Sequence, residues 1–208
     1  DIHFVTDAEA VRGFFENVPK TRRQGLEATV EWEATGALTF DGALAYTRAT
    51  FQSEARLATG LLDLEEEGEE EEEEPADGEE AEPALVEPGD EFSVVPEITF
   101  TLGAEFEKDG WKAGLSGDFV GEQWFAGDEN NTGALGKLDS YFLLDARVSR
   151  VVGPVELYAE GRNILDSRYE PFGLLARNVR GPDVGSVDAF LTPDEPLRVF
   201  AGVRATIR

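Results

Sequence analysis

The chain has 208 residues, of which 30% are charged, and it carries a formal net charge of −26 with a mean hydropathy of −0.31. No stretch approaches the roughly 20 apolar residues that a membrane-spanning helix needs, which excludes a helical membrane protein but leaves a barrel of alternating strands open. The acidic balance argues against a nucleic-acid partner, because phosphates require Lys and Arg, and the absence of Cys excludes disulfides and thiolate sites.

Apolar and polar residues alternate with a period of two along much of the chain, which predicts β-strands with one apolar and one polar face. A partial strand is expected near residues 2–5, while residues 8–18 are left unassigned. The alternating stretches then follow at 26–33, 38–47, 98–107, 111–119, 142–149, 155–162 and 197–207. This pattern predicts an all-β protein with seven strands of about 10–14 residues and a partial eighth.

The connections between these strands alternate strictly between short turns and long loops. Short turns are expected at 35–37, 108–110 and 151–154, and long loops follow the second, fourth and sixth strands. This connectivity is typical of an antiparallel transmembrane β-barrel, and the strands are about twice as long as those of a soluble sandwich. A soluble all-β binding domain is disfavoured, because a dry core would not accept the charges on the polar faces.

Aromatic residues lie near both ends of the predicted apolar face, as in the interfacial girdles of membrane barrels. Those beside the short turns are Trp32, Phe40, Phe106 and Trp111, and those towards the long loops are Tyr46 and Phe119. The plainer alternative is that aromatic residues simply favour strands.

The acidic residues are concentrated in one segment. Between Asp63 and Glu91 there are 17 acidic residues and no basic ones, which leaves 27 acidic and 18 basic residues elsewhere. Like charges repel and remain solvated, so we expect a disordered external loop, and a homopolymeric run of Glu lacks the spacing of a calcium loop. The sequence thus divides into barrel strands at 1–52, an acidic external loop at 53–95 and C-terminal barrel strands at 96–208.

Two groups of residues are candidates for function. The first comprises charges predicted to face the barrel lumen, as an ion-paired wall or, alternatively, as ligand contacts: Asp145, Arg147, Glu156, Glu160 and Arg162. The second combines aromatic and amide side chains in an external loop that could capture a ligand, although such loops are common: Trp124, Phe125, Asp128, Asn130 and Asn131. Catalysis and metal or cofactor binding are not expected, because His3 is the only histidine and no nucleotide-binding motif occurs.

Several short motifs resemble one known family. Residues 17–21 (NVPKT) with 25–27 (GLE), residues 141–147, residues 163–169 (NILDSRY) and residues 196–198 (PLR) are similar, in this order, to motifs of the TonB-dependent outer-membrane receptors. The resemblance covers residues 17–207 apart from the acidic segment. It implies a wall of about 22 strands closed around a plug, of which this chain would supply seven or eight.

By this resemblance, the protein would lie in a bacterial outer membrane, in contact with lipid, and import a small scarce nutrient such as a ferric siderophore or cobalamin. Energy would come through TonB, which acts on a plug segment absent from this chain, and the lack of Met predicts that an N-terminal segment precedes Asp1. The alternative is a self-contained eight-stranded outer-membrane barrel that serves as an anchor or adhesin.

Overall fold

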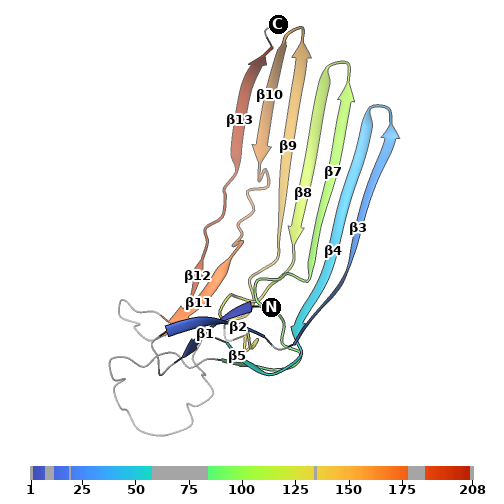
Figure 1. Cartoon of the computed structure of the whole chain (residues 1–208). Helices are drawn as coiled ribbons and strands as arrows, with labels where there is room; N and C mark the ends of the chain where they lie inside the picture. The colour runs from blue at the N-terminus through green and yellow to red at the C-terminus, as the bar shows by residue number, and fades with distance from the viewer. Residues whose placement is uncertain are drawn as a thin grey trace.

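The structure is a computed structural model and describes residues 2–7, 12–18, 20–57, 84–133, 135–177 and 186–206. Seven long strands form its main body: β3 (Thr21–Thr35), β4 (Leu38–Phe51), β7 (Ile98–Lys108), β8 (Trp111–Val120), β9 (Tyr141–Val152), β10 (Val155–Arg162) and β13 (Arg198–Ala205). They make one antiparallel sheet in the order β13-β10-β9-β8-β7-β4-β3 (Figure 1). The seven predicted strands are therefore confirmed, with lengths of 8 to 15 residues rather than 10–14.

Three small hairpins lie at one end of this sheet (Figure 1). They are β1–β2 (Ile2–Asp7 and Arg12–Asn17), β5–β6 (Ala55–Leu57 and Ala84–Val86) and β11–β12 (Gly173–Arg177 and Val187–Leu191). The hairpin β1–β2 includes residues 12–17, which the sequence left unassigned, and β11–β12 lies inside the third predicted loop. The Glu-rich run from Glu65 to Glu74 lies outside the described residues. The described part of the chain contains no helix, and so none long and apolar enough to span a membrane.

Short turns close the opposite end of the sheet. Between β7 and β8, Asp109 and Gly110 both have positive φ angles, of 51° and 77°. This conformation suits Asp-Gly and matches the right-handed twist of the flanking strands. The alternation of short turns and long connections read from the sequence is thus present in the structure.

The register of the strands shows that they are tilted relative to the line of turns. Leu38 lies in the last residue pair before the β3–β4 turn, and across the sheet it is level with Phe106 and Val148. Phe106 lies two residue pairs from the end of the β7–β8 hairpin, and Val148 lies four pairs from the end of the β9–β10 hairpin. Each hairpin is therefore displaced by two residues relative to its neighbour. With a rise of about 3.4 Å per residue and about 4.8 Å between strands, this displacement corresponds to a tilt of about 35°. Such a tilt is what closure into a barrel requires.

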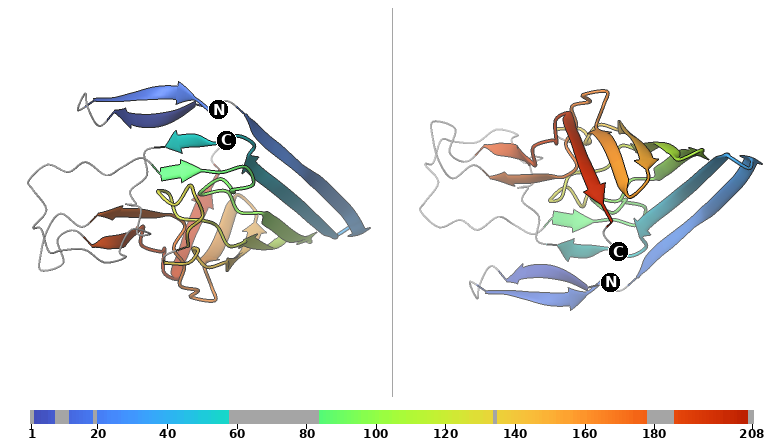
Figure 2. Two further views of the ribbon diagram at one scale, coloured as in Figure 1. Left: turned by 90° about the horizontal axis from the view of Figure 1, so that it is seen from below. Right: turned by 90° about the horizontal axis from the view of Figure 1, so that it is seen from above.

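The sheet has no hydrophobic core along its length. Its apolar face, defined by Leu26, Val30, Leu102, Leu115 and Val203, is exposed, with 51–67% of each of these side chains accessible. The sheet curves across its strands (Figure 2). All buried hydrophobic residues of the described chain lie instead at the loop end, in two clusters and their surroundings: Val18, Ala49, Phe51, Leu57, Val86, Phe92, Phe125, Leu138 and Leu175.

Candidate functional site

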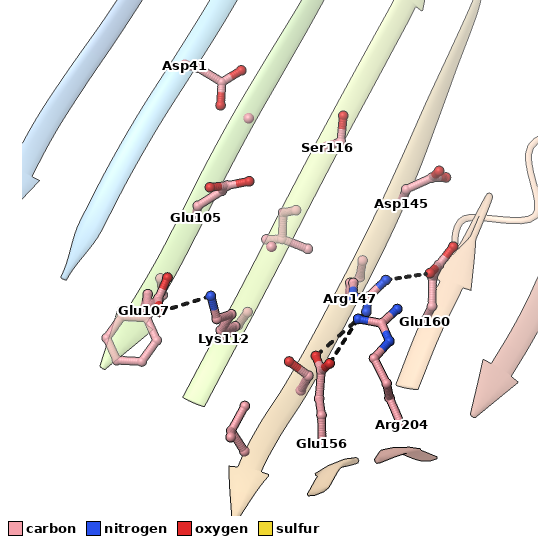
Figure 3. Close-up of a pocket in the computed structure, with 18 residues that line it drawn as sticks. Asp41, Glu105, Glu107, Lys112, Ser116, Asp145, Arg147, Glu156, Glu160 and Arg204 are labelled. Atoms are coloured by element: carbon pink, nitrogen blue, oxygen red, sulfur yellow. Dashed lines mark hydrogen bonds and ion pairs between the residues drawn. The ribbon is translucent and has the colours of Figure 1, made fainter. Parts of the chain in front are cut away.

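The charges of the seven strands gather on the face opposite the apolar one, which we call the charged face. The registers place ten carboxylates and six cations there, and all five predicted wall residues, Asp145 to Arg162, are among them. This face is hollowed by about 780 Å³ (Figure 3). The labelled charged residues around the hollow come from six strands, β4 to β13: Asp41, Glu105, Glu107, Lys112, Asp145, Arg147, Glu156, Glu160 and Arg204.

Ion pairs connect β9, β10 and β13 across the hollow (Figure 3). The Arg147 guanidinium lies between two carboxylates, 3.3 Å from Glu160 and 3.8 Å from Glu156. Glu156 also accepts from Arg204 at 3.1 Å, and Glu160 accepts from Arg162 at 2.8 Å. Arg204 belongs to this ladder but was missed from the sequence, because its partner Glu156 is 48 residues away.

An aromatic ring supports the centre of this ladder. The Arg147 guanidinium lies 5.0 Å from the centroid of the Tyr158 ring. Tyr158 pairs with Gly202 across β10 and β13, and its ring occupies the space that a Cβ at Gly202 would need. Gly202 therefore allows the ring to lie flat on the next strand, where it orients Arg147 between its two carboxylates.

The two halves of the charged face differ in electrostatics. In the half formed by β9, β10 and β13, the arginines of the charged face all lie in ion pairs, and Asp145 instead accepts from the Asn163 N–H. In the half formed by β3, β4 and β7, the described carboxylates of Glu31, Asp41 and Glu105 have no ion-pair partner. Glu107 of this half pairs with Lys112 of β8 at 2.9 Å. These groups are exposed, so water solvates them at little cost. The face thus offers a wet, polar surface along which a hydrophilic solute could pass.

Asn163 ties the end of β10 to the base of the last long loop. Its backbone N–H donates to the Asp145 carboxylate at 2.9 Å, and its side-chain amide donates to the carbonyls of Ser167 and Glu195, also at 2.9 Å. Its side-chain oxygen accepts from the Ser167 N–H at 2.9 Å. Asn163 is 4% exposed and has a φ of 47°, a conformation that Asn tolerates better than most residues. Asp145 is therefore a support of this turn as well as a wall residue.

The five predicted mouth residues lie in one loop, but two of them are buried. Phe125 is 6% exposed and packs with Leu138 and Leu175, and Asp128 is fully buried. The Asp128 carboxylate accepts from the Thr132 N–H, the Thr132 hydroxyl and the Gly133 N–H, at 2.9, 3.0 and 3.1 Å. These contacts give Phe125 and Asp128 structural roles, and ligand capture by the loop stays a prediction.

Trp124 and Asn131 join this loop to the segment that follows β6. The Trp124 indole N–H donates to the Glu91 carboxylate at 2.9 Å, and Lys137 donates to the same oxygen at 3.2 Å. The Asn131 amide donates to the Glu91 carbonyl at 3.0 Å, and its oxygen accepts from the Glu91 N–H at 2.5 Å. Glu91 is therefore the hub of the loop end, a role that its acidic neighbours in the sequence concealed.

The pKa values of two carboxylates at the loop end, Glu91 and Glu129, are shifted in opposite directions. Burial alone would raise the pKa of Glu91, but hydrogen bonds from Trp124 and Lys137 and the charge of Lys137 outweigh it and lower that pKa. Burial dominates at Glu129, whose pKa is raised despite hydrogen bonds from backbone N–H groups. Within the described ranges, no group of three or more His, Asp or Glu side chains could hold a metal ion.

Comparisons with known proteins agree with this architecture. The sequence profile of the family described as TonB dependent receptor-like, beta-barrel, matches residues 3–164. No curated protein sequence matches the chain significantly.

Among solved structures, the siderophore receptor PiuA from Acinetobacter baumannii is similar with a TM-score of 0.58 and 16% identity, over 91% of this chain and 22% of that one. The ferric yersiniabactin uptake receptor FyuA from Yersinia pestis has a TM-score of 0.58 and 15% identity, over 91% and 24%. The copper transporter OprC is similar with a TM-score of 0.57 and 15% identity, over 97% of this chain and 26% of that one. Such identities show the fold alone, and the chain spans about a quarter of the length of these structures.

Proposed function

This chain belongs to the TonB-dependent receptor family, and we propose that it forms about a third of the wall of an outer-membrane barrel that imports a scarce nutrient. The rest of the wall and the plug would come from segments outside this chain. In this role the chain is a structural part of a transporter and performs no catalysis.

One observation carries this proposal: a tilted, open sheet whose apolar face is exposed and whose opposite face is charged. The side chains of Leu26, Val30 and Leu115 are more than half exposed. Contact of this apolar surface with water would be unfavourable, whereas lipid chains would cover it. The charged face would then line an aqueous lumen. At the sheet's edges, β3 pairs only with β4 and β13 only with β10 among the described strands, so both edges remain open for further strands.

The nutrient is proposed as a small solute such as a ferric siderophore, cobalamin or a similar metal complex. The names of PiuA, FyuA and OprC, which describe siderophore and copper uptake, support this class for a barrel of the same fold. The polar lining of the hollow supports passage of a hydrophilic solute. Energy would reach the barrel from TonB through the plug.

The test is the native size of the species that contains this chain. Outer membranes would be extracted in mild detergent and analysed unheated and heated, with the mass determined in each case. We expect a heat-modifiable species several times larger than the 22.7 kDa of this chain, containing plug sequence. A heat-modifiable barrel of about 22.7 kDa would instead support the self-contained anchor.

A transport assay then tests the nutrient class. Cells with and without the full-length protein would be compared for uptake of labelled ferric siderophores and cobalamin, with and without TonB. Uptake that requires both the protein and TonB is expected. Uptake independent of TonB would contradict the proposal.

A further inference from the structure

The charges on the apolar face are few, and all of them have one sign. The registers place four charged residues of the seven strands on this face, and each is a cation: Arg22, Arg48, Lys108 and Arg150. The charged face, in contrast, holds ten carboxylates. In a chain with 44 acidic and 18 basic residues, this separation shows that carboxylates are kept off the apolar face and cations are accepted at its rims.

The four cations lie at the two ends of the apolar face. Lys108 and Arg150 flank the short turns, where Arg150 donates to the Asp109 carbonyl at 2.8 Å and lies 4.9 Å from the Trp111 ring centroid. Arg22 and Arg48 lie at the loop end. Arg22 is the next residue after Gln24 on this face of β3, and Arg48 is the next after Tyr46 on this face of β4, both towards the loops. The middle of the face carries no charge, which is the distribution expected for a surface that crosses a bilayer.

Arg22 and Arg48 form a pair on neighbouring strands. Arg48 is opposite Gln24, and Arg22 is opposite Thr50, so the two arginines occupy diagonal positions, about 7–8 Å apart at their Cα atoms. Both are exposed. Within the described chain neither makes an ion pair, although the charge of Arg48 helps to lower the pKa of Glu91.

Arg23, which follows Arg22 in the sequence, lies on the charged face and contacts an aromatic ring. Arg23 points to the charged face, where its guanidinium lies 5.0 Å from the centroid of Phe92. In the wall, Arg147, Arg162 and Arg204 all have carboxylate partners. Arg22 and Arg48 thus present two guanidinium groups outward, beside apolar side chains. The Glu91 carboxylate, which lies beside Thr50 and feels the charge of Arg48, already accepts hydrogen bonds from Trp124 and Lys137.

We propose that Arg22 and Arg48 form a docking surface for the anionic phosphate headgroups of lipids in the leaflet on the loop side. This inference rests on the proposed function, because it takes the apolar face to be covered by lipid. A guanidinium binds phosphate oxygens through paired N–H donors, and its stem can cover apolar surface while its head reaches the interface. The sign of the charge selects an anionic headgroup over a zwitterionic one.

The test reads lipid enrichment at the pair itself. In the full-length receptor, in a background without other accessible cysteines, Gln24→Cys places a fluorophore beside Arg48 on the apolar face. The receptor would be placed in phosphatidylcholine bilayers that contain a trace of headgroup spin-labelled phosphatidylglycerol or spin-labelled phosphatidylcholine. The ratio of quenching by the two lipids measures the local enrichment of the anionic headgroup.

With both arginines present, we expect phosphatidylglycerol to be enriched, by about fivefold per cation and up to about 25-fold for the pair. The double variant Arg22→Gln, Arg48→Gln should bring the ratio close to one. The control Lys112→Gln, Arg168→Gln removes the same charge from the charged face and from an exposed loop, and it should leave the ratio unchanged.

The alternatives are separated by the same measurement. A ratio close to one in the unaltered receptor would overturn the inference, as would equal losses in the double variant and the control. If neither lipid quenches the fluorophore, the apolar face does not contact lipid, and the proposed function fails together with the inference. Quenching that is equal for both lipids overturns the docking surface alone.

Discussion

The wall of the sheet and its loop end place their apolar side chains in opposite environments. Along the wall, Leu26, Leu102 and Val203 are more than half exposed, whereas at the loop end Phe51, Val86 and Leu175 are fully buried. The loop end therefore derives its stability from burial within the chain, as a water-soluble domain does. The wall gains little from such burial, so its stability depends on backbone pairing and on what covers its apolar face.

This difference predicts different responses to mutation in the two regions. At the loop end, truncating a buried side chain should leave a cavity and weaken local structure. In the wall, truncation should matter less than the introduction of a charge, because lipid adjusts to a smaller side chain but does not solvate an ion.

The largest effect is expected for Phe51→Ala. Phe51 is fully buried, and its ring centroid lies 4.5 Å from that of Phe92. Its loss should lower the free energy of unfolding of the loop end by about 3–5 kcal/mol. Hydrogen exchange of the full-length receptor should show faster exchange in residues 84–95. The exchange of β7 and β8 should not change, and equal acceleration there would remove the distinction between the two regions.

A charge in the middle of the apolar face should have the next largest effect. Leu102→Arg should destabilise the folded receptor by about 2–4 kcal/mol in a bilayer, because the guanidinium would lie near the midplane. Refolding into vesicles at increasing urea concentration measures this cost. Ser116→Arg introduces the same charge on the charged face, and it should cost much less. Equal costs would mean that the two faces have the same surroundings.

Asn163→Ala should have a smaller effect, confined to the junction between the two regions. The substitution leaves the carbonyls of Ser167 and Glu195 and the Ser167 N–H without their partner, which costs about 1–3 kcal/mol. Limited proteolysis should then cleave the connection between β10 and β13 faster. Asn163→Asp keeps the acceptor but loses both side-chain donors, so its cleavage rate should be intermediate. An unchanged rate in both variants would contradict the role of Asn163 as a clamp.

The smallest effect concerns the pH dependence of the loop end. The pKa of Glu91 is lowered in the folded chain, so its stabilisation is present above the unfolded value, near 4.5, and is lost as the pH falls through the folded pKa. Trp124 fluorescence should therefore change on acidification below about pH 4.5, and Glu91→Gln should remove most of this change. Acidification should act on stability in the opposite direction through Glu129. Its pKa is raised, and its protonation relieves an unfavourable buried charge. A change on acidification that persists in Glu91→Gln would assign it to another group.

Much of the wall could be predicted from the sequence, because its determinants are local. Alternation places Leu102 and Glu105 on opposite faces whatever their partners are, and Asp109-Gly110 specifies a tight turn through its own backbone conformation. The wall residues Asp145, Arg147, Glu156, Glu160 and Arg162 were placed on one face by the same reasoning. The pairing of Glu156 with Arg204 could not be predicted, because it depends on how β13 lies against β10.

The loop end could not be predicted in this way, because its contacts join segments far apart in the sequence. Glu91 meets Trp124, Asn131 and Lys137 across 33 to 46 residues, and Asn163 reaches Glu195 across 32. The sequence alone determined the strands, their faces and their turns, since a period of two and a turn conformation are properties of short segments. Only the tertiary structure decided that Phe125 and Asp128 are buried and that Glu91 is a hub, because burial and pairing depend on which distant segments the sheet brings together.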